Sequence, residues 1–289
     1  MITHVAEAGE DRGRVLLTLG SSGRLSDVAL EAAVRLAQAF HSELESLFVE
    51  DLQLYDLARF TFARETSRSG RTTRALLPSV IERDVQLQAA ALGRRVLVAA
   101  TLLDVRARAR VVRDEPARAL AKACAEKGPW NVVTLGEPFG ATDEGALSEL
   151  FQTVDATTGF VITGPKARRT KGPVVALVEE VERLPSMLRA AERLASVTGG
   201  EPRIWLLEDG PDRLAWLDGQ IRLSLGLKAA AIKLEAYDMM RSDIGALAAS
   251  LRQHEAGFVI ARIGGRLASA DEGSVPIAAL LEGPLFLAR

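Results

Sequence analysis

The sequence has few of the residues that mark secreted, metal-binding or membrane proteins. Its one cysteine, Cys124, rules out a disulfide within the chain. The three histidines, His4, His41 and His254, are not spaced as in a metal site or a catalytic triad. No apolar run reaches the roughly 18 residues that a membrane-spanning helix needs, and the start does not resemble a signal peptide. We therefore expect a cytoplasmic protein with no membrane span.

Charge and composition narrow the possibilities further. The chain has 289 residues, a net charge of -2, 48% hydrophobic residues and 26% charged residues. This balance gives no general attraction to nucleic acid or to anionic membranes. The length predicts two domains of ordinary size, each able to bury its own core. Abundant alanine, and arginine in place of lysine, are typical of a GC-rich bacterial genome.

A strand–helix–strand pattern occurs twice. Residues 14–20 form a near-continuous apolar strand, residues 25–40 a helix with one apolar face, and residues 44–49 a second strand. The same pattern returns 158 positions later, where residues 16–19, 32–37 and 48–51 align with residues 174–177, 190–195 and 206–209. Several elements at one offset predict an internal duplication into two domain-sized copies.

The rest of the chain continues the alternation of strands and helices. In the first copy we expect further strands at 105–112, 130–135 and 159–163, and helices at 76–103, 115–127 and 146–156. In the second copy we expect strands at 173–178, 203–207, 229–236, 257–262 and 285–289, and helices at 184–197, 212–225 and 242–255. This order predicts the α/β class, with a doubly wound, five-stranded parallel sheet in each domain. Arginines alternating along 106–110 favour an edge position for that strand.

The predicted boundaries follow from composition. Residues 1–13 are an N-terminal arm, 14–164 the first domain and 173–289 the second, and the Gly-, Pro- and Arg-rich stretch 165–172 is the linker. At the fourth strand the offset between the copies falls to 128, so the second copy is shorter by roughly 30 residues. The missing residues correspond to an extra segment, 52–73, of the first copy.

The extra segment 52–73 combines aromatic and basic side chains. We expect a helix to about residue 65 and a loop over 66–73. Two interpretations stay open: a helix packed over its own sheet, or a lid or partner-contacting surface formed by Tyr55, Phe60, Phe62 and Arg64. The second rests on the position of the segment after the carboxyl end of a strand, where such sheets bind ligands. The segment is too local to imply nucleic acid, and its protein partner is unknown.

Several short motifs carry a resemblance to a known family. The first strand runs into Leu19-Gly20-Ser21-Ser22, the next helix holds an Ala-x-x-Leu-Ala pattern over 33–37, and the second strand ends in Val49-Glu50-Asp51. The second copy closes with Gly273-Ser274 before a last apolar strand. This order resembles the universal stress protein family in tandem form. The resemblance implies Rossmann-like domains related to the adenine-nucleotide alpha-hydrolases, paired as an intramolecular pseudo-dimer through strands 159–163 and 285–289. A further homodimer stays open.

The family resemblance also implies where a nucleotide would bind. ATP-binding members carry Gly-x2-Gly-x9-Gly-Ser/Thr after the fourth strand, so that backbone N–H groups and a helix N-terminus meet the phosphates. In the first copy the corresponding residues are Leu19, Gly20, Ser21, Val49, Gly136, Gly140 and Gly145. In the second copy they are Gly264, Gly265, Gly273 and Ser274.

Both copies depart from that pattern. In the first, Leu19 replaces an acid, the loop from Gly136 to Gly145 is too short and holds Glu137, and no hydroxyl follows Gly145. In the second, Glu179 and Glu180 follow the first strand directly, and Asp271 and Glu272 add negative charge. Carboxylates repel phosphate, so these changes predict degenerate nucleotide sites.

Three functional hypotheses follow. The first is a non-catalytic stress-response protein that acts through protein or small-ligand interaction and needs no cofactor and no metal. The second is an ATP- or AMP-binding universal stress protein with weak or no hydrolysis. The third is an enzyme of a related α/β fold, but the chain shows no P-loop, Gly-x-Ser-x-Gly or Cys-x2-Cys motif and no catalytic constellation. The sequence favours the first.

Overall fold

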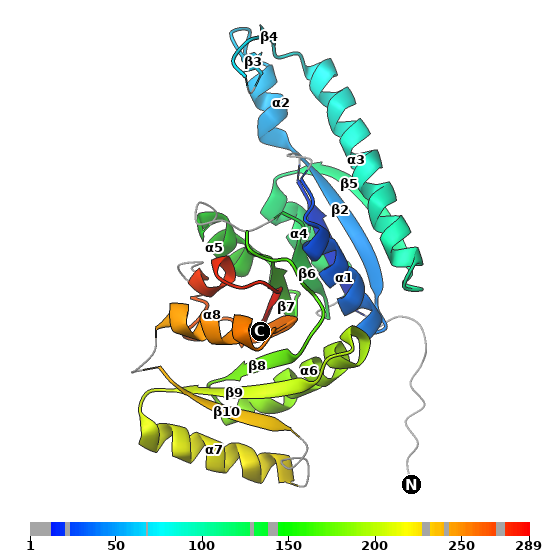
Figure 1. The fold of residues 1–289 in the computed structure, drawn as a ribbon. Coiled ribbons are helices and arrows are strands. Elements are labelled where there is room, and N and C mark those ends of the chain that lie inside the picture. Colours follow the sequence, from blue (N-terminus) through cyan, green and yellow to red (C-terminus); the bar gives the residue numbers. More distant parts are fainter. Residues whose placement is uncertain are drawn as a thin grey trace.

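A single mostly parallel sheet with helices on both faces organises the chain (Figure 1). The computed structural model describes residues 13–20, 24–67, 69–127, 130–137, 144–226, 232–239, 243–269 and 275–289, with the backbone alone at 144–146. Within these residues the sheet has ten strands, and a separate two-stranded hairpin lies beyond it, at the far end of α2 (Leu52–Ala58) (Figure 1).

The elements follow the predicted alternation. The first half consists of β1 (Arg14–Leu19), α1 (Asp27–Ala39), β2 (Glu43–Asp51), α2 (Leu52–Ala58), β3 (Arg64–Thr66), β4 (Thr73–Ala75), α3 (Pro78–Thr101), β5 (Ala107–Asp114), α4 (Pro116–Ala125), β6 (Val132–Leu135), α5 (Glu144–Thr153) and β7 (Gly159–Ile162). The second half consists of β8 (Val174–Val178), η2 (Val181–Arg183), α6 (Leu184–Thr198), β9 (Pro202–Glu208), α7 (Pro211–Leu225), β10 (Lys233–Asp238), α8 (Ile244–Gln253), β11 (Phe258–Arg262), η4 (Pro276–Ala279) and β12 (Leu285–Ala288).

The strand order is the same in both halves. The sheet runs β10-β9-β8-β11-β12-β7-β6-β1-β2-β5, and neighbouring strands within each half are parallel. When the hairpin strands β3 and β4 are left out, each half contributes five strands to the sheet. From the centre of the sheet outward, both halves have these strands in the order fifth, fourth, first, second and third along the chain. The α/β class and the mostly parallel sheet are thereby confirmed. The five-stranded sheets expected for two domains are, however, joined into one.

The join is the antiparallel pair β7–β12, formed by the two strands expected to meet. Its register runs from Leu285 opposite Ile162 to Ala288 opposite Gly159. A Cβ at Gly159 would lie 2.3 Å from the Leu287 carbonyl oxygen, so the backbones approach too closely there for any other residue without a shift. On one face α1 and α6 lie beside each other across the join, and Arg35 of α1 donates to the Val197 carbonyl oxygen at 2.9 Å.

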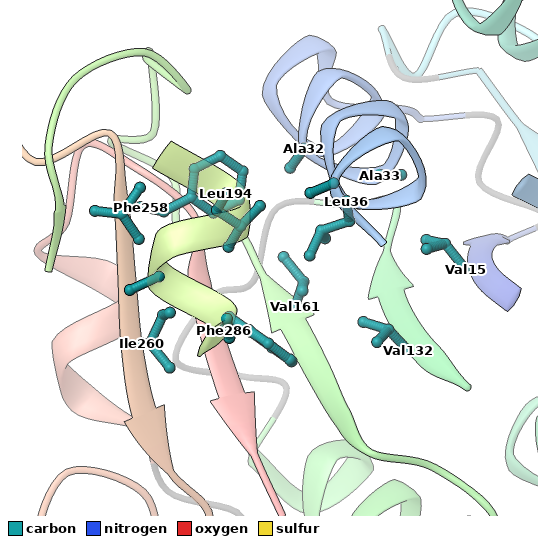
Figure 2. Packing of buried hydrophobic residues seen from close by; sticks show 14 of the residues in the cluster. Val15, Ala32, Ala33, Leu36, Val132, Val161, Leu194, Phe258, Ile260 and Phe286 are labelled. Atoms are coloured by element: carbon teal, nitrogen blue, oxygen red, sulfur yellow. The ribbon is translucent and has the colours of Figure 1, made fainter. Parts of the chain in front are cut away.

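The apolar core forms one layer on each face of the sheet. Alternate strand residues point to opposite faces, so Val15 and Leu17 of β1 face one layer while Leu16 faces the other. The first layer is closed by α1, α3, α6 and α7, and the second by α4, α5, α8 and η4. Figure 2 shows the first layer, in which Leu36 of α1 and Leu194 of α6 lie over the central strands.

The segment 52–73 differs from the prediction. Its helix, α2, starts after the N-cap residue Asp51 but ends at Ala58, and residues 64–75 form the hairpin β3–β4 rather than the end of a helix and a loop. The Ser67 amide donates to the Thr72 carbonyl oxygen at 2.8 Å, and Gly70 takes a φ of 70° in the turn. The predicted continuous helix was wrong because β-branched threonines and a glycine-bearing turn favour the hairpin.

The predicted linker 165–172 is tied to the second half. The amides of Arg168 and Arg169 both donate to the Glu282 carbonyl oxygen, at 2.7 and 3.1 Å, and both side chains form ion pairs with the Glu282 carboxylate. Hydrogen bonding from Arg168 lowers the pKa of that carboxyl. The basic residues of this stretch therefore anchor it, rather than simply keeping it in solvent.

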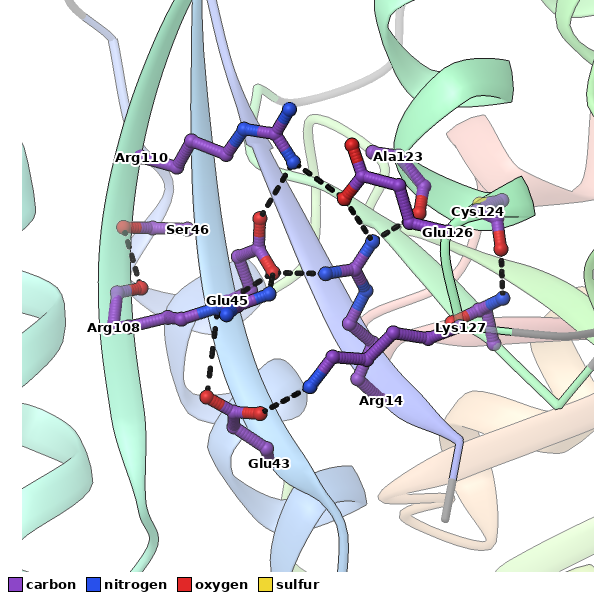
Figure 3. A network of polar contacts seen from close by, with 11 residues as sticks. Arg14, Glu43, Glu45, Ser46, Arg108, Arg110, Ala123, Cys124, Glu126 and Lys127 are labelled. Carbon is purple, nitrogen blue, oxygen red and sulfur yellow. Dashed lines mark hydrogen bonds and ion pairs between the residues drawn. The ribbon is translucent and has the colours of Figure 1, made fainter. Parts of the chain in front are cut away.

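A buried ion pair lies at the amino ends of β1 and β2. The side chains of Arg14 and Glu45 are both 0% exposed and form an ion pair (Figure 3). Arg108 of the edge strand β5 also reaches Glu45, and Arg110 pairs with Glu126 at 2.7 Å. The edge position predicted for this strand is confirmed, and two of its alternating arginines have a specific structural role.

Replacing Glu45 should destabilise the fold strongly. In Glu45→Ala the Arg14 guanidinium stays buried without its carboxylate, so we expect the free energy of unfolding to fall by about 3–5 kcal/mol. Urea denaturation followed by circular dichroism measures this change. As a control, Glu65→Ala removes the exposed pair with Arg74 in the hairpin and should cost less than about 1 kcal/mol. Equal effects of the two substitutions would contradict the buried network.

Candidate functional site

In doubly wound sheets, ligands bind outside the carboxyl ends of the strands. In the first half these ends carry Gly20 after β1 and Gly136 after β6. Their distance and surroundings determine whether a phosphate could be bound there.

Gly136 is required for backbone packing. A Cβ at this position would lie 2.2 Å from the Thr18 carbonyl oxygen, to which the Gly136 amide donates at 3.1 Å. The Gly136 carbonyl oxygen accepts from the amide of Ser26, the N-cap of α1, at 2.9 Å. The glycine therefore joins the ends of β1 and β6 to the start of α1.

A carboxylate lies over the neighbouring glycine. A Cβ at Gly20 would lie 2.7 Å from Oε1 of Glu137, so this side chain occupies the space above the end of β1. The sequence pattern predicted that Glu137 would repel phosphate, and the structure brings it directly to the first-half crevice. Of the other residues predicted there, Leu19 and Val49 have their side chains buried in the core, at 1% and 4% exposure. They can offer a ligand only backbone groups.

Five of the residues predicted to bind nucleotide are not described by the structure or are described by their backbone alone. Ser21, Gly140, Gly273 and Ser274 lie outside the described residues. Gly145 lies in the first turn of α5, in the part for which the backbone alone is described. The binding role predicted for these residues therefore stays a prediction.

In the second half the loop after β11 folds tightly on itself. Gly264 takes a φ of 77°, and its amide donates to the Ala268 carbonyl oxygen at 2.7 Å. Gly265 and Ala268 form an isolated antiparallel bridge. The two predicted glycines thus form a compact turn over the end of β8.

Glu179 lies against this turn. Both of its carboxylate oxygens accept from the Arg266 amide at 3.2 Å, and a Cβ at Gly265 would lie 2.9 Å from one of them. In the phosphate-binding members of such folds, loop amides of this kind meet an anion. Here a side chain of the protein supplies the anion. Burial raises the pKa of Glu179, and the hydrogen bond from the Arg266 amide partly opposes this.

Ion pairs surround Glu179. The Arg266 guanidinium lies 3.0 Å from Oε2 of Glu208 and 2.6 Å from Oδ2 of Asp209, at the carboxyl end of β9. Arg262 of β11 pairs with Glu180. The acids Glu179 and Glu180 were predicted from the sequence, but these arginines, which neutralise the crevice, were not. The sequence feature that could have predicted these arginines is the acidic pair Glu208-Asp209 at the end of β9. The carboxyl ends of parallel strands lie close together, so several acids gathered there require a neighbouring cation.

The residues predicted as a lid separate into two places. The Tyr55 hydroxyl donates to Oε2 of Glu50 at 3.1 Å, and the Arg113 guanidinium lies over the Tyr55 ring at 4.1 Å. Burial and the hydrogen bond to Glu50 raise the pKa of Tyr55. This cluster holds the base of an arm, residues 52–75, that extends with α3 beyond the carboxyl end of β2 (Figure 1).

The tip of the arm carries the other three. Phe60 and Phe62 are stacked with ring centroids 5.3 Å apart, yet they are 53% and 75% exposed. Arg64 is exposed nearby at the start of β3. Because α2 packs against α3, the arm is not the helix over its own sheet that was one interpretation of the sequence.

Other reactive groups are engaged in structure. Cys124 is fully buried, and burial raises the pKa of its thiol to about 12, so it is protonated at neutral pH. His254 caps the end of α8 and lies edge-on against Trp205. In the described part of the chain no three His, Cys, Asp or Glu side chains gather as metal ligands would. Nor does any described helix combine the length and apolarity needed to cross a bilayer.

The comparisons with known proteins concern the fold. No protein-family model matches the chain, and no curated protein matches it. Among solved structures, it is similar to a universal stress protein from Archaeoglobus fulgidus, with 13% identity, a TM-score of 0.61, and 95% of this chain and 96% of that one covered. It is also similar to a putative universal stress protein from Pseudomonas aeruginosa, with 13% identity, a TM-score of 0.56, and 96% and 94% covered.

A third solved structure of the same fold is a domain of a transport protein. The cytoplasmic domain of a prokaryotic cation chloride cotransporter matches with 9% identity and a TM-score of 0.54, over 96% of this chain and 95% of that one. At such identities the likeness shows the fold alone. The fold predicted from the family resemblance is therefore shared with universal stress proteins over nearly the whole chain.

Removing the Glu179 carboxylate should change how stability depends on pH. In the unfolded chain the Glu179 carboxyl has a pKa near its ordinary value of 4.5, and in the native state this pKa is raised. Above that ordinary value the native state therefore still binds a proton that the unfolded chain has lost. Stability then falls as pH rises through this window. We expect the unfolding free energy of the native sequence, minus that of Glu179→Gln, to decrease between about pH 4 and pH 7.

Urea titrations of both proteins at several pH values measure this difference. All other titrating groups are present in both proteins, so their contributions to the pH dependence cancel in this difference and only that of Glu179 remains. A difference that is constant or that increases with pH would show that Arg266, rather than burial, dominates at Glu179.

Proposed function

We propose that this chain is a non-catalytic regulatory protein of the universal stress protein type, whose nucleotide crevices have been closed by its own carboxylates. It arose by tandem duplication, works in the cytoplasm and acts by contact with a partner. The duplication is supported by the identical strand order of the two halves and by the offset of 158 positions between their sequences.

One observation carries the proposal. Each crevice holds a carboxylate beside the glycines that would face phosphate: Glu137 over Gly20, and Glu179 against Gly265. A bound triphosphate would have to displace Glu179 from the Arg266 amide, as well as overcome the repulsion of nearby Glu180 and Glu208. The positive charges that could compensate, Arg262 and Arg266, already form ion pairs with acids of the protein.

The arm provides the contact surface in this proposal. A stacked aromatic pair that is largely exposed at the end of a projecting hairpin is typical of a surface that another molecule covers. The second half has no matching hairpin among its described residues, so the arm gives the pseudo-symmetric molecule one distinct end. The cotransporter domain of the same fold supports the view that this scaffold also occurs as part of larger assemblies.

The alternative function, binding of ATP or AMP, makes an opposite prediction for thermal stability. A ligand at one hundred times its dissociation constant stabilises the native state by about 2.7 kcal/mol. We expect the melting temperature to shift by less than about 1 °C with 1 mM ATP or AMP and Mg²⁺, and we expect native mass spectrometry to find no co-purified nucleotide. Thermal scanning with increasing nucleotide measures the shift.

A matched variant makes the test specific to the crevice. Glu179→Gln keeps the shape of the side chain but removes its charge, so any residual affinity for phosphate should increase in this variant. A saturable shift in the native sequence, or nucleotide retained through purification, would refute the proposal and establish the alternative.

A partner at the arm should be detectable by site-specific photocrosslinking. With p-benzoylphenylalanine in place of Phe62, we expect a discrete crosslinked product in the host cell, because this side chain is 75% exposed at the proposed contact. The control carries the same group in place of Leu223, which is 77% exposed on α7. Products of equal yield at both positions, or none at position 62, would contradict a contact role for the arm.

A further inference from the structure

A cavity of about 1120 Å³ lies away from both crevices. It opens between the end of α1 and one side of α6, over the amino ends of β1, β6 and β7 and the end of β12. Val15, Val132 and Phe286, which are labelled in Figure 2, are among its lining residues. Both halves of the chain therefore contribute to it, and among the described lining residues there is none of the glycines predicted to bind nucleotide.

The lining is basic. Four arginines, Arg14, Arg189, Arg193 and Arg289, line the cavity together with His41, and none of the described lining residues is acidic. Two of these cations are already bound by the protein. Arg14 pairs with buried Glu45, and Arg289 donates to the carbonyl oxygens at the end of α5, at 2.7 Å to that of Val154.

Arg189 and Arg193 remain available. Both are exposed on α6, and neither forms an ion pair with a described residue. They are four residues apart and therefore lie on the same helix face, where like charges repel each other. Arg193 is directed across the join, with its guanidinium 5.6 Å from the centre of the Phe40 ring of α1. An anion between the two guanidinium groups would relieve their repulsion and accept charge-assisted hydrogen bonds.

The same cavity has an aromatic wall. Trp130, just before β6, is 64% exposed although its indole is one of the largest apolar groups in the chain. The Trp130 backbone packs directly on Gly13, where a Cβ would lie 1.5 Å from the Trp130 carbonyl oxygen. With Phe40 and Phe286, Trp130 gives the cavity surfaces on which a flat ring can pack.

We propose that this cavity binds a small organic anion with an aromatic body, its charged group held by Arg189 and Arg193 and its ring packed against Trp130. The cavity is large enough for a ligand of drug size, since such pockets usually span about 300–1000 Å³. The site does not depend on the proposed closure of the nucleotide crevices, so a nucleotide found in a crevice leaves this inference intact.

The probe pair 8-anilinonaphthalene-1-sulfonate and N-phenyl-1-naphthylamine tests the site, because the two share their rings and differ in the sulfonate. We expect the sulfonate to bind saturably at one molecule per chain, measured by its fluorescence. In Arg189→Gln/Arg193→Gln, sulfonate affinity should fall about tenfold or more, the effect of losing charge-assisted hydrogen bonds. Affinity for the neutral amine should change by less than about twofold.

Two controls match these changes. Arg71→Gln/Arg94→Gln removes two exposed arginines remote from the cavity and should leave both affinities unchanged. Trp130→Ala should weaken both probes about tenfold, whereas Trp216→Ala, which removes an indole of the same 64% exposure on α7, should weaken neither. More than one sulfonate per chain, or equal losses in a test variant and its control, would overturn the proposal. If the double variant does not fold, Arg189→Gln alone makes the same comparison.

Discussion

The antiparallel pairing of β7 with β12 is the constraint on which the structure depends. Each half ends in a short apolar strand whose outer edge would expose unpaired N–H and C=O groups if that half stood alone. Pairing the two edges satisfies those groups and makes one sheet of two. It also brings α1 against α6, because the two helices cover the same face on either side of the join. The arginine-lined cavity exists only because of this contact.

Charge is used differently at the two ends of the sheet. At the carboxyl ends, Glu137 and Glu179 lie against glycine turns, and in the second half arginines neutralise the acids of three strands. At the amino ends of the first half, Arg14 is buried with Glu45, while Arg189 and Arg193 remain at the surface of the cavity. In the second-half crevice an anion would therefore find Arg262 and Arg266 already paired with acids of the protein, whereas at the cavity it would meet two guanidinium groups that have no such partner among the described residues.

Much of the fold could be predicted from local patterns. The strands of the first half were identified within a few residues, because an apolar run covered on both faces has a clear sequence pattern, and the edge position of β5 followed from its alternating arginines. The hairpin β3–β4 was missed because its residues are exposed and have no apolar periodicity to distinguish a strand from a loop.

The candidate site could be predicted only in part. Glu137 was found because it stands within a glycine pattern of known spacing, and Glu179 because it directly follows the first strand of the second copy, where a glycine turn was expected. Arg266 was not singled out, since its partners Glu208 and Asp209 are distant in sequence and meet it only where β9 and the loop after β11 come together. The Arg14–Glu45 pair was missed for the same reason, as two charged residues inside apolar strands give no sign of being opposite each other.

The sequence alone predicts the alternation of strands and helices, and with it the α/β class, because hydrophobic periodicity is a local property of each segment. It also determined that acids follow the strands where a phosphate would bind. The continuous ten-stranded sheet, the arginines from distant segments that neutralise those acids, and the basic cavity between α1 and α6 are visible only once the chain is folded. These features depend on residues that are distant in sequence, within the second half for the arginines and across the join for the sheet and the cavity. Such long-range contacts are set by packing the whole chain rather than by any one segment.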